Sequence, residues 1–278
     1  MKTCDLHSHS YYSDGSLSPK ELVALAKRQG LSALALTDHN TAKGLAEFME
    51  AGRQADFETI AGCEFSTEFE GREYHILGLF MPESSWAEIE DYVLLQHMAK
   101  RNSNKKLIEK LNDAGFHISY EEVAAITDAD EFNRAHVARV LLKKNYVKSV
   151  QHAFETLLDQ ENGYYTPPKR LGSVGTIHFI RQYGGAAVWA HPFHRTDEAT
   201  VERVLPVFAE QGLDAIETVY TTFTAHETER AKELAAQYGL LESGGSDFHG
   251  AAKPNISLGS GYGELVVPYA FCEKLKES

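Results

Sequence analysis

The sequence lacks the features that mark secreted, disulfide-bonded and membrane-spanning proteins. Its three cysteines, Cys4, Cys63 and Cys272, are far apart and form no CxxC pair, so neither a disulfide framework nor a zinc ribbon is predicted. We expect free, buried thiols in a reducing compartment. No apolar run approaches the roughly 18 residues that a membrane span needs, and no signal peptide is recognisable at the start. We therefore expect a soluble, cytoplasmic protein with no membrane partner.

Positive charge is also scarce. The 278 residues include 27 Lys+Arg and 40 Asp+Glu, which gives a formal net charge of −13. Duplex DNA and anionic membranes bind cationic surfaces, so the charge excludes duplex DNA as the main partner. The deficit is uneven, because residues 97–170 contain 12 basic and 10 acidic residues (+2) and the remainder contains 15 and 30 (−15). A small anionic substrate therefore remains compatible with this chain.

Strand and helix patterns alternate at both ends of the chain. A Ser18-Pro19 pair followed by Glu21 predicts a capped helix start, and Glu70-Gly71 predicts a turn between two strands. The middle is helical in pattern from about 84 to 158, with polar breaks near Asp128 and Asn145. Alternating strands and helices indicate an α/β protein with a parallel sheet or barrel. We predict a barrel domain from residues 1–96 and 171–278 and a mostly helical insertion over 97–170 that caps the active site. The strands are expected near 3–7, 32–37, 58–67, 74–80, 186–190, 215–219 and 240–243.

Histidines and carboxylates recur where these strands meet loops. His7 and His9 stand two residues apart on one strand, so both point to the same face and can bind one ion. In α/β barrels this rim carries the active site, and imidazoles mixed with carboxylates suit Zn, Mn or Fe better than calcium. Nine candidate ligands exceed the needs of one tetrahedral ion, so two or three divalent metal ions are predicted. The remaining candidates are Asp14, His39, Glu64, His75, His191, Asp247 and His249.

Packing explains such a pattern poorly. One HxH motif, or one Ala-His-Pro, would fit a surface or core pair as well as a metal site. A histidine after each of several separate strands does not, because histidine favours neither cores nor strands. Asp38 and Glu217, beside these positions, are expected to orient ligating histidines without binding metal themselves.

Taken together, these motifs resemble the PHP (polymerase and histidinol phosphatase) family. The resemblance implies a distorted (β/α)7 barrel with up to three divalent metals. It implies that His7, His9 and Asp247 hold the first, that Glu64 bridges to a second held by His75 and His191, and that Asp14, His39 and His249 hold the third. The motifs are His7-Ser8-His9, Ser13-Asp14-Gly15, Thr37-Asp38-His39, Gly62-Cys63-Glu64, His75, Ala190-His191-Pro192 and Ser246-Asp247-Phe248-His249.

A finer resemblance lies in the insertion. The run from Asn133 to Arg139, with Arg134 and His136, and the later run from Gly163 to Pro168 are similar to one PHP subgroup. Its members remove the 3′-phosphate of 3′,5′-nucleoside bisphosphates, and some trim short RNA from the 5′ end. Two loops depart from that subgroup. Phe193-His194-Arg195 replaces a Gly-Arg pair, and Tyr220-Thr221-Thr222-Phe223 replaces a Ser/Gly-rich stretch, which leaves the chain-length preference open.

The resemblance implies a metal-dependent phosphoesterase in which a metal-bridging hydroxide attacks phosphorus. The expected substrate is a small phosphorylated nucleotide or a short single-stranded RNA end. His194 or Arg195 would serve the leaving group, and Arg134, His136 and Lys169 would bind a second phosphate. Three alternatives stay open: a phosphatase of a non-nucleotide ester such as histidinol phosphate, a non-catalytic metal-bearing accessory module, and a barrel that hydrolyses at carbon. The sequence does not indicate the oligomeric state.

Overall fold

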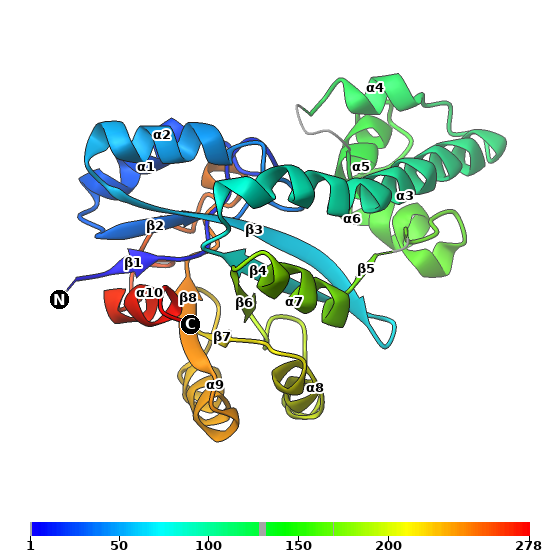
Figure 1. The fold of residues 1–278 in the computed structure, drawn as a ribbon. Helices are drawn as coiled ribbons and strands as arrows, with labels where there is room; N and C mark the ends of the chain where they lie inside the picture. The colour runs from blue at the N-terminus through cyan, green and yellow to red at the C-terminus, as the bar shows by residue number, and fades with distance from the viewer. Residues whose placement is uncertain (1, 128–131, 169) are drawn as a thin grey trace. The chain divides into compact units, whose positions relative to one another are not determined.

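A computed structural model describes residues 2–127, 132–168 and 170–278 of the chain (Figure 1). The chain divides into two compact units. The first comprises Met1–Asp91 and Leu171–Ser278, and the second comprises Tyr92–Arg170. No helix among the described residues is long and apolar enough to cross a membrane.

The first unit is built on one curved sheet. Leu6, the residue after the first strand, donates from its N to Gly244 O in the last strand over 3.1 Å. The two ends of the sheet therefore meet. The seven principal strands therefore form a nearly closed barrel, which confirms the predicted distorted (β/α)7 architecture. Its strands lie in the order β1 (Cys4–Asp5), β2 (Ala33–Leu36), β3 (Glu58–Phe69), β4 (Arg72–Leu79), β6 (Ala186–Trp189), β7 (Ala215–Tyr220) and β8 (Leu241–Gly245), and β5 (Leu171–Gly172) pairs with β3.

The distortion lies at β4, which runs antiparallel to both of its neighbours. The β3–β4 hairpin turns at Glu70 and Gly71, whose φ values of 51° and 77° suit a tight turn with a left-handed backbone. A strand of reversed direction starts at the rim where the parallel strands end. His75 near the start of β4 therefore reaches the same rim as residues that follow β1, β2 and β6.

Helices cover the outside of the sheet. The predicted capping box is present at α1, where Ser18 accepts from Glu21 N and the Glu21 side chain accepts from Ser18 N. Figure 1 shows α1 and α2 side by side over β2. The barrel interior is filled by small and branched residues such as Ala35, Leu77 and Val188. The helices of this unit are α1 (Pro19–Arg28), α2 (Leu45–Ala55), α7 (Ser173–Gln182), α8 (Glu198–Glu210), α9 (Ala225–Tyr238) and α10 (Tyr269–Leu275), with 3-10 turns at Glu83–Ser85 and Gly250–Ala252.

The second unit is helical and has its own core. Its helix α3 (Trp86–Asp113) begins in the first unit, and buried side chains such as Leu111, Phe132 and Leu158 pack together within the second. Asn145 adopts a left-handed backbone (φ 61°) at one of the predicted helix breaks, and the other, near Asp128, lies outside the described residues. The remaining elements are α4 (Tyr120–Ala124), α5 (Arg134–Lys143), α6 (Val150–Ala153), a π-helical turn (Phe154–Leu158) and a 3-10 turn (Gln160–Asn162).

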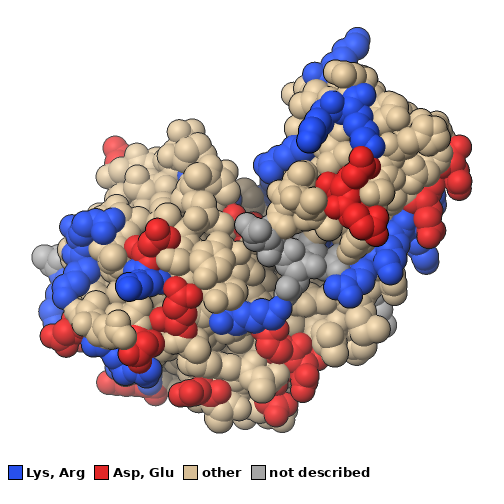
Figure 2. Space-filling model, turned by 90° about the horizontal axis from the view of Figure 1, so that it is seen from above, with Lys and Arg blue, Asp and Glu red and all other residues tan. Residues whose placement is uncertain are grey.

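Charged side chains of both signs share the molecular surface. Figure 2 shows Lys and Arg interspersed with Asp and Glu on the face it presents. Such a mixture differs from the continuous basic surface that duplex DNA recruits, in keeping with the net charge.

Candidate metal centre and active site

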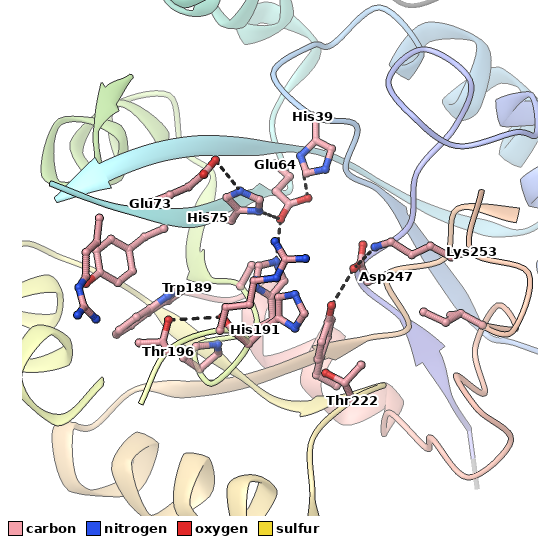
Figure 3. A pocket seen from close by; sticks show the side chains of 18 of the residues that line it. His39, Glu64, Glu73, His75, Trp189, His191, Thr196, Thr222, Asp247 and Lys253 are labelled. Carbon is pink, nitrogen blue, oxygen red and sulfur yellow. Dashed lines mark hydrogen bonds and ion pairs between the residues drawn. The ribbon is translucent and has the colours of Figure 1, made fainter. Parts of the chain in front are cut away.

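Glu64 is the centre of a buried cluster of histidines. It lies in β3, where its side chain is 1% exposed, and both carboxylate oxygens face imidazole nitrogens. Figure 3 shows His39, His75 and His191 converging on it. One carboxylate surrounded by imidazoles from five chain positions is an arrangement suited to bridging metal ions. Oε2 lies 3.1 Å from His7 Nε2, 3.2 Å from His9 Nε2 and 3.1 Å from His39 Nδ1, and Oε1 lies 2.7 Å from His75 Nδ1 and 3.1 Å from His191 Nε2.

Asp247 joins the cluster from the loop after β8. Its Oδ1 lies 3.1 Å from His9 Nε2, 3.4 Å from His249 Nδ1 and 3.6 Å from His7 Nε2. Asp247 and His191 have φ values of 55° and 33°, a backbone region that non-glycine residues seldom adopt. Strain of this kind persists where the surrounding structure imposes it, often at functional sites.

Asp14 forms the outer edge of the cluster. Its Oδ1 lies 3.1 Å from His249 Nε2, its Oδ2 lies 3.9 Å from His39 Nε2, and its side chain is 49% exposed. His249 Nδ1 hydrogen-bonds the Asp247 carbonyl over 2.8 Å, which leaves Nε2 to face Asp14. All nine residues predicted as metal ligands therefore lie in one cluster within the first unit.

Three subsets of the cluster are compact enough to hold an ion, with ligand atoms within 4.8 Å of one another. They differ in detail from the allocation that the family resemblance implies. His9 belongs to two subsets, the one with Asp14 and the one with Asp247. The subset with Glu64 and His75 contains His39, whereas the resemblance implied His191. The subsets are His7, His9, Glu64 and Asp247; His9, Asp14, His39 and His249; and His39, Glu64 and His75.

Glu217 supports two of these histidines. Buried on β7, it places Oε1 3.0 Å from His7 Nδ1, while Oε2 accepts from His191 N over 2.6 Å. With its proton on Nδ1, His7 presents the Nε2 lone pair to the cluster. The prediction that Glu217 orients a histidine is confirmed for His7.

Asp38 has a different role from the one expected. Its oxygens accept from Ser10 N over 2.8 Å, from Ser10 Oγ over 2.6 Å and from Ser13 Oγ over 2.6 Å. No histidine hydrogen-bonds Asp38 among the described residues, so it does not orient a histidine in the direct way that was expected. Asp38 instead fixes the loop that connects His9 to Asp14, and so places two cluster residues through their backbone.

Two residues that the sequence analysis missed hold the second oxygen of Asp247. Tyr220 Oη donates to Asp247 Oδ2 over 2.8 Å, and Lys253 Nζ donates to the same atom over 2.7 Å. These contacts leave Oδ1 facing His7 and His9. A tyrosine at the end of one strand and a lysine on a loop carry no spacing signal, although Tyr220 begins a stretch already noted as unusual.

The electrostatics of the cluster favour cations. Burial alone would raise the pKa of Glu64, but the surrounding histidines, His39 and His7 foremost, hold it well below its usual range. Burial opposes a charge on His75, yet Glu64 raises its pKa to about 10. Burial likewise opposes a charge on His9, yet Asp247 and Glu64 raise its pKa to about 9. The buried carboxylates thus draw protons onto neighbouring imidazoles, and divalent ions would replace those protons.

Unpaired nitrogens test whether metal ions fit. Among the described residues, His9 Nδ1, His9 Nε2 and His39 Nδ1 are buried and have no hydrogen-bond partner, although carboxylate oxygens approach both His9 Nε2 and His39 Nδ1 within about 3.2 Å. The oxygens therefore lie off the hydrogen-bonding direction. Buried polar atoms without partners are costly, and a cation shared between nitrogen and oxygen would satisfy both. The donor set fits divalent metal ions.

A cavity of about 910 Å³ opens over this cluster. Figure 3 shows Asp247 and Lys253 on one side of His191 and Trp189 and Thr196 on the other. Both predicted catalytic residues, His194 and Arg195, line it. Burial, followed by His191 and Arg195, lowers the pKa of His194 to about 4, so at neutral pH it lacks the extra proton that an imidazolium acid would donate.

The predicted substrate-binding residues are placed differently. Arg134 and His136 lie on α5 of the second unit, and Lys169 lies outside the described residues. Arg134 Nη1 donates to Leu158 O over 2.9 Å, and its guanidinium lies 4.3 Å from the Tyr165 ring centroid. The Arg134 guanidinium therefore contacts other residues of the second unit, and its assignment to substrate remains a prediction.

Known proteins resemble this chain over most of its length. The profile of the PHP domain family matches residues 5–216. A 5′-3′ exoribonuclease from Haemophilus influenzae is 33% identical, over 89% of this chain and 90% of that protein. A phosphoribosyl 1,2-cyclic phosphate 1,2-diphosphodiesterase from Eggerthella lenta is 29% identical, over 88% and 94%. A 3′,5′-nucleoside bisphosphate phosphatase from Chromobacterium violaceum is 27% identical, over 93% and 91%.

A solved structure shares the architecture. A crystal structure from Bifidobacterium adolescentis, whose description suggests a metal-dependent phosphoesterase, superposes with a TM-score of 0.81. The two are 26% identical, and the match covers 99% of this chain and 95% of the other. The likeness therefore extends over both the barrel and the helical unit.

Proposed function

This chain belongs to the PHP family and is a metal-dependent phosphoesterase, and from that premise we propose that it removes the 3′-phosphate of 3′,5′-nucleoside bisphosphates. The 5′-phosphorylated end of short RNA is its second proposed substrate. The observation that carries the proposal is the cavity of about 910 Å³, which combines the histidine–carboxylate cluster with cationic side chains. That volume lies within the range of nucleotide-sized pockets. The relatives named for bisphosphate and RNA substrates support this choice.

The nine cluster residues would hold the metal ions. Bound divalent ions would neutralise the phosphoryl oxygens and lower the pKa of the attacking water. Glu217 Oε1 lies 3.0 Å from His7 Nδ1, which favours a proton on that nitrogen, and Tyr220 with Lys253 keeps Asp247 Oδ1 turned toward the histidines. These contacts fix the ligand atoms before substrate arrives, which spares reorganisation during the reaction.

Arg195 is the proposed phosphate-binding residue within the cavity. It ends the turn from Pro192 to Arg195, with a left-handed backbone (φ 59°), and its guanidinium has no ion-pair or hydrogen-bond partner among the described residues. An unpaired guanidinium offers a fork of donors to phosphate oxygens. His194 remains the second candidate, and Arg134, His136 and Lys169 stay proposed contacts for the other phosphate.

A substrate panel tests the proposal. Metal-loaded protein should release phosphate from adenosine 3′,5′-bisphosphate with a kcat/KM at least about 100-fold above that for histidinol phosphate, because the cavity and its cations match a doubly phosphorylated nucleotide. A 5′-phosphorylated RNA dinucleotide should rank second. Phosphoribosyl 1,2-cyclic phosphate is the competing substrate, since the Eggerthella lenta relative is named for it. A kcat/KM for that cyclic ester above the value for the bisphosphate would overturn the proposal and leave the phosphoesterase assignment intact.

A further inference from the structure

We propose that Tyr262 is a stacking platform for the substrate's nucleobase, and this inference rests on the proposed function. Tyr262 is 63% exposed and lines the same cavity as the metal-binding cluster. Single exposed aromatic rings are common on protein surfaces. The way in which this ring is held distinguishes it.

The loop that carries Tyr262 is closed on itself by two backbone hydrogen bonds. Ser257 N donates to Gly261 O and Gly261 N donates to Ser257 O, each over 2.8 Å. The residues on either side of the tyrosine, Gly261 and Gly263, have φ values of 55° and 114°, which glycine adopts without strain. The backbone thus presents the ring in a defined place, which lowers the entropy lost when a ligand stacks on it.

Asp5 connects this loop to the metal-binding residues. This fully buried carboxylate accepts from Gly259 N over 2.8 Å, from Ser246 N over 2.9 Å and from Ser246 Oγ over 2.5 Å. Ser246 directly precedes Asp247. The platform and a candidate metal ligand are therefore fixed by the same buried group.

Thr221 provides a second connection. Its Oγ1 donates to Ser246 O over 2.7 Å. A Cβ placed on Gly261 would lie 2.8 Å from Thr221 Oγ1. The loop therefore packs directly against Thr221, on the segment that follows Tyr220. Both connections fix the backbone next to Tyr262 against Ser246, the residue before Asp247.

The neighbours of Tyr262 in the cavity wall suit a nucleotide. Pro254 and Ile256 add apolar surface, and Lys253 adds a cation next to Asp247. Bases stack on aromatic side chains through their π-faces, with little preference among the four. The ligand assigned to this wall is therefore a planar nucleobase, its phosphates directed toward Lys253 and the cluster.

Substitution of Tyr262 tests the platform. Tyr262→Ala should raise the KM for adenosine 3′,5′-bisphosphate about tenfold with little change in kcat, which is the loss of one stacked base. Tyr262→Phe keeps the ring and should match the wild type. Val266→Ala, at a residue that is 54% exposed and does not line the cavity, is the matched control. Because Tyr262 is exposed, none of these variants should change the melting temperature by more than about 2 °C.

A binding measurement separates the base from the phosphate. Calorimetry should show that Tyr262→Ala weakens the affinity for adenosine 5′-phosphate about tenfold and leaves the affinity for ribose 5-phosphate unchanged. If the wild type hydrolyses the bisphosphate but Tyr262→Ala changes the affinity for both ligands equally, or for neither, the platform is wrong and the proposed function stands. A wild type that hydrolyses neither the bisphosphate nor the RNA end would overturn the proposed function, and the platform with it.

Discussion

Glu64→Gln should reduce phosphoesterase activity by about 1,000-fold or more. The substitution keeps the shape of the side chain. It removes the one carboxylate among the described residues that faces His7, His39 and His75 together. Metal ions supply several kcal/mol of transition-state stabilisation, and each 1.36 kcal/mol corresponds to a tenfold change in rate. Metal content, measured by inductively coupled plasma mass spectrometry, should fall with the rate.

The matched control is Glu68→Gln. Glu68 lies four residues further along β3 and is exposed, so its substitution makes the same chemical change on the same strand without touching the cluster. Its activity and metal content should equal those of the wild type. A Glu64→Gln protein that kept its metals and stayed within tenfold of wild-type activity would remove Glu64 from the centre of the site.

Removal of the metal ions should destabilise the first unit and abolish activity. Metal binds the folded cluster and not the unfolded chain, so each site held at 100 times its dissociation constant adds about 2.7 kcal/mol. Two such sites would raise the melting temperature of the unit by about 10 °C. Dialysis against EDTA followed by calorimetry should reveal the loss, and Mn²⁺ or Zn²⁺ should restore it.

Calcium is the control ion for this experiment. It prefers oxygen ligands, whereas the cluster offers six imidazoles with three carboxylates, so Ca²⁺ should restore neither stability nor activity. An EDTA-treated protein with an unchanged melting transition and full activity would contradict a structural and catalytic role for bound metal.

The barrel could be predicted because its signals are local. Ser18 and Glu21 specify a helix start through their own hydrogen bonds, and Glu70-Gly71 specifies a turn through its backbone preference. The direction of β4 could not be read in this way. Strand patterning has the same period in either direction, so only the short Glu70-Gly71 connection indicates that the chain reverses before His75.

The candidate site was predictable to the extent that its residues have special chemistry. Histidine is rare at strand ends, so its recurrence there is a signal. Asp38 and Glu217 look alike in sequence, one just after a strand and the other within one, yet Asp38 binds serines and Glu217 binds His7. Their difference arises from which neighbour the fold brings within about 3 Å. The same reason explains why Tyr220 and Lys253 emerged only from the structure.

The identity of the products of adenosine 3′,5′-bisphosphate hydrolysis tests the account most directly. Phosphorus NMR of the reaction with metal-loaded protein follows each phosphate separately. We predict that the 3′-phosphate signal is replaced by inorganic phosphate while the 5′-phosphate signal persists, so that adenosine 5′-phosphate is the sole nucleotide product. Formation of adenosine 3′-phosphate, or no change in a protein shown to contain its metals, would contradict the account.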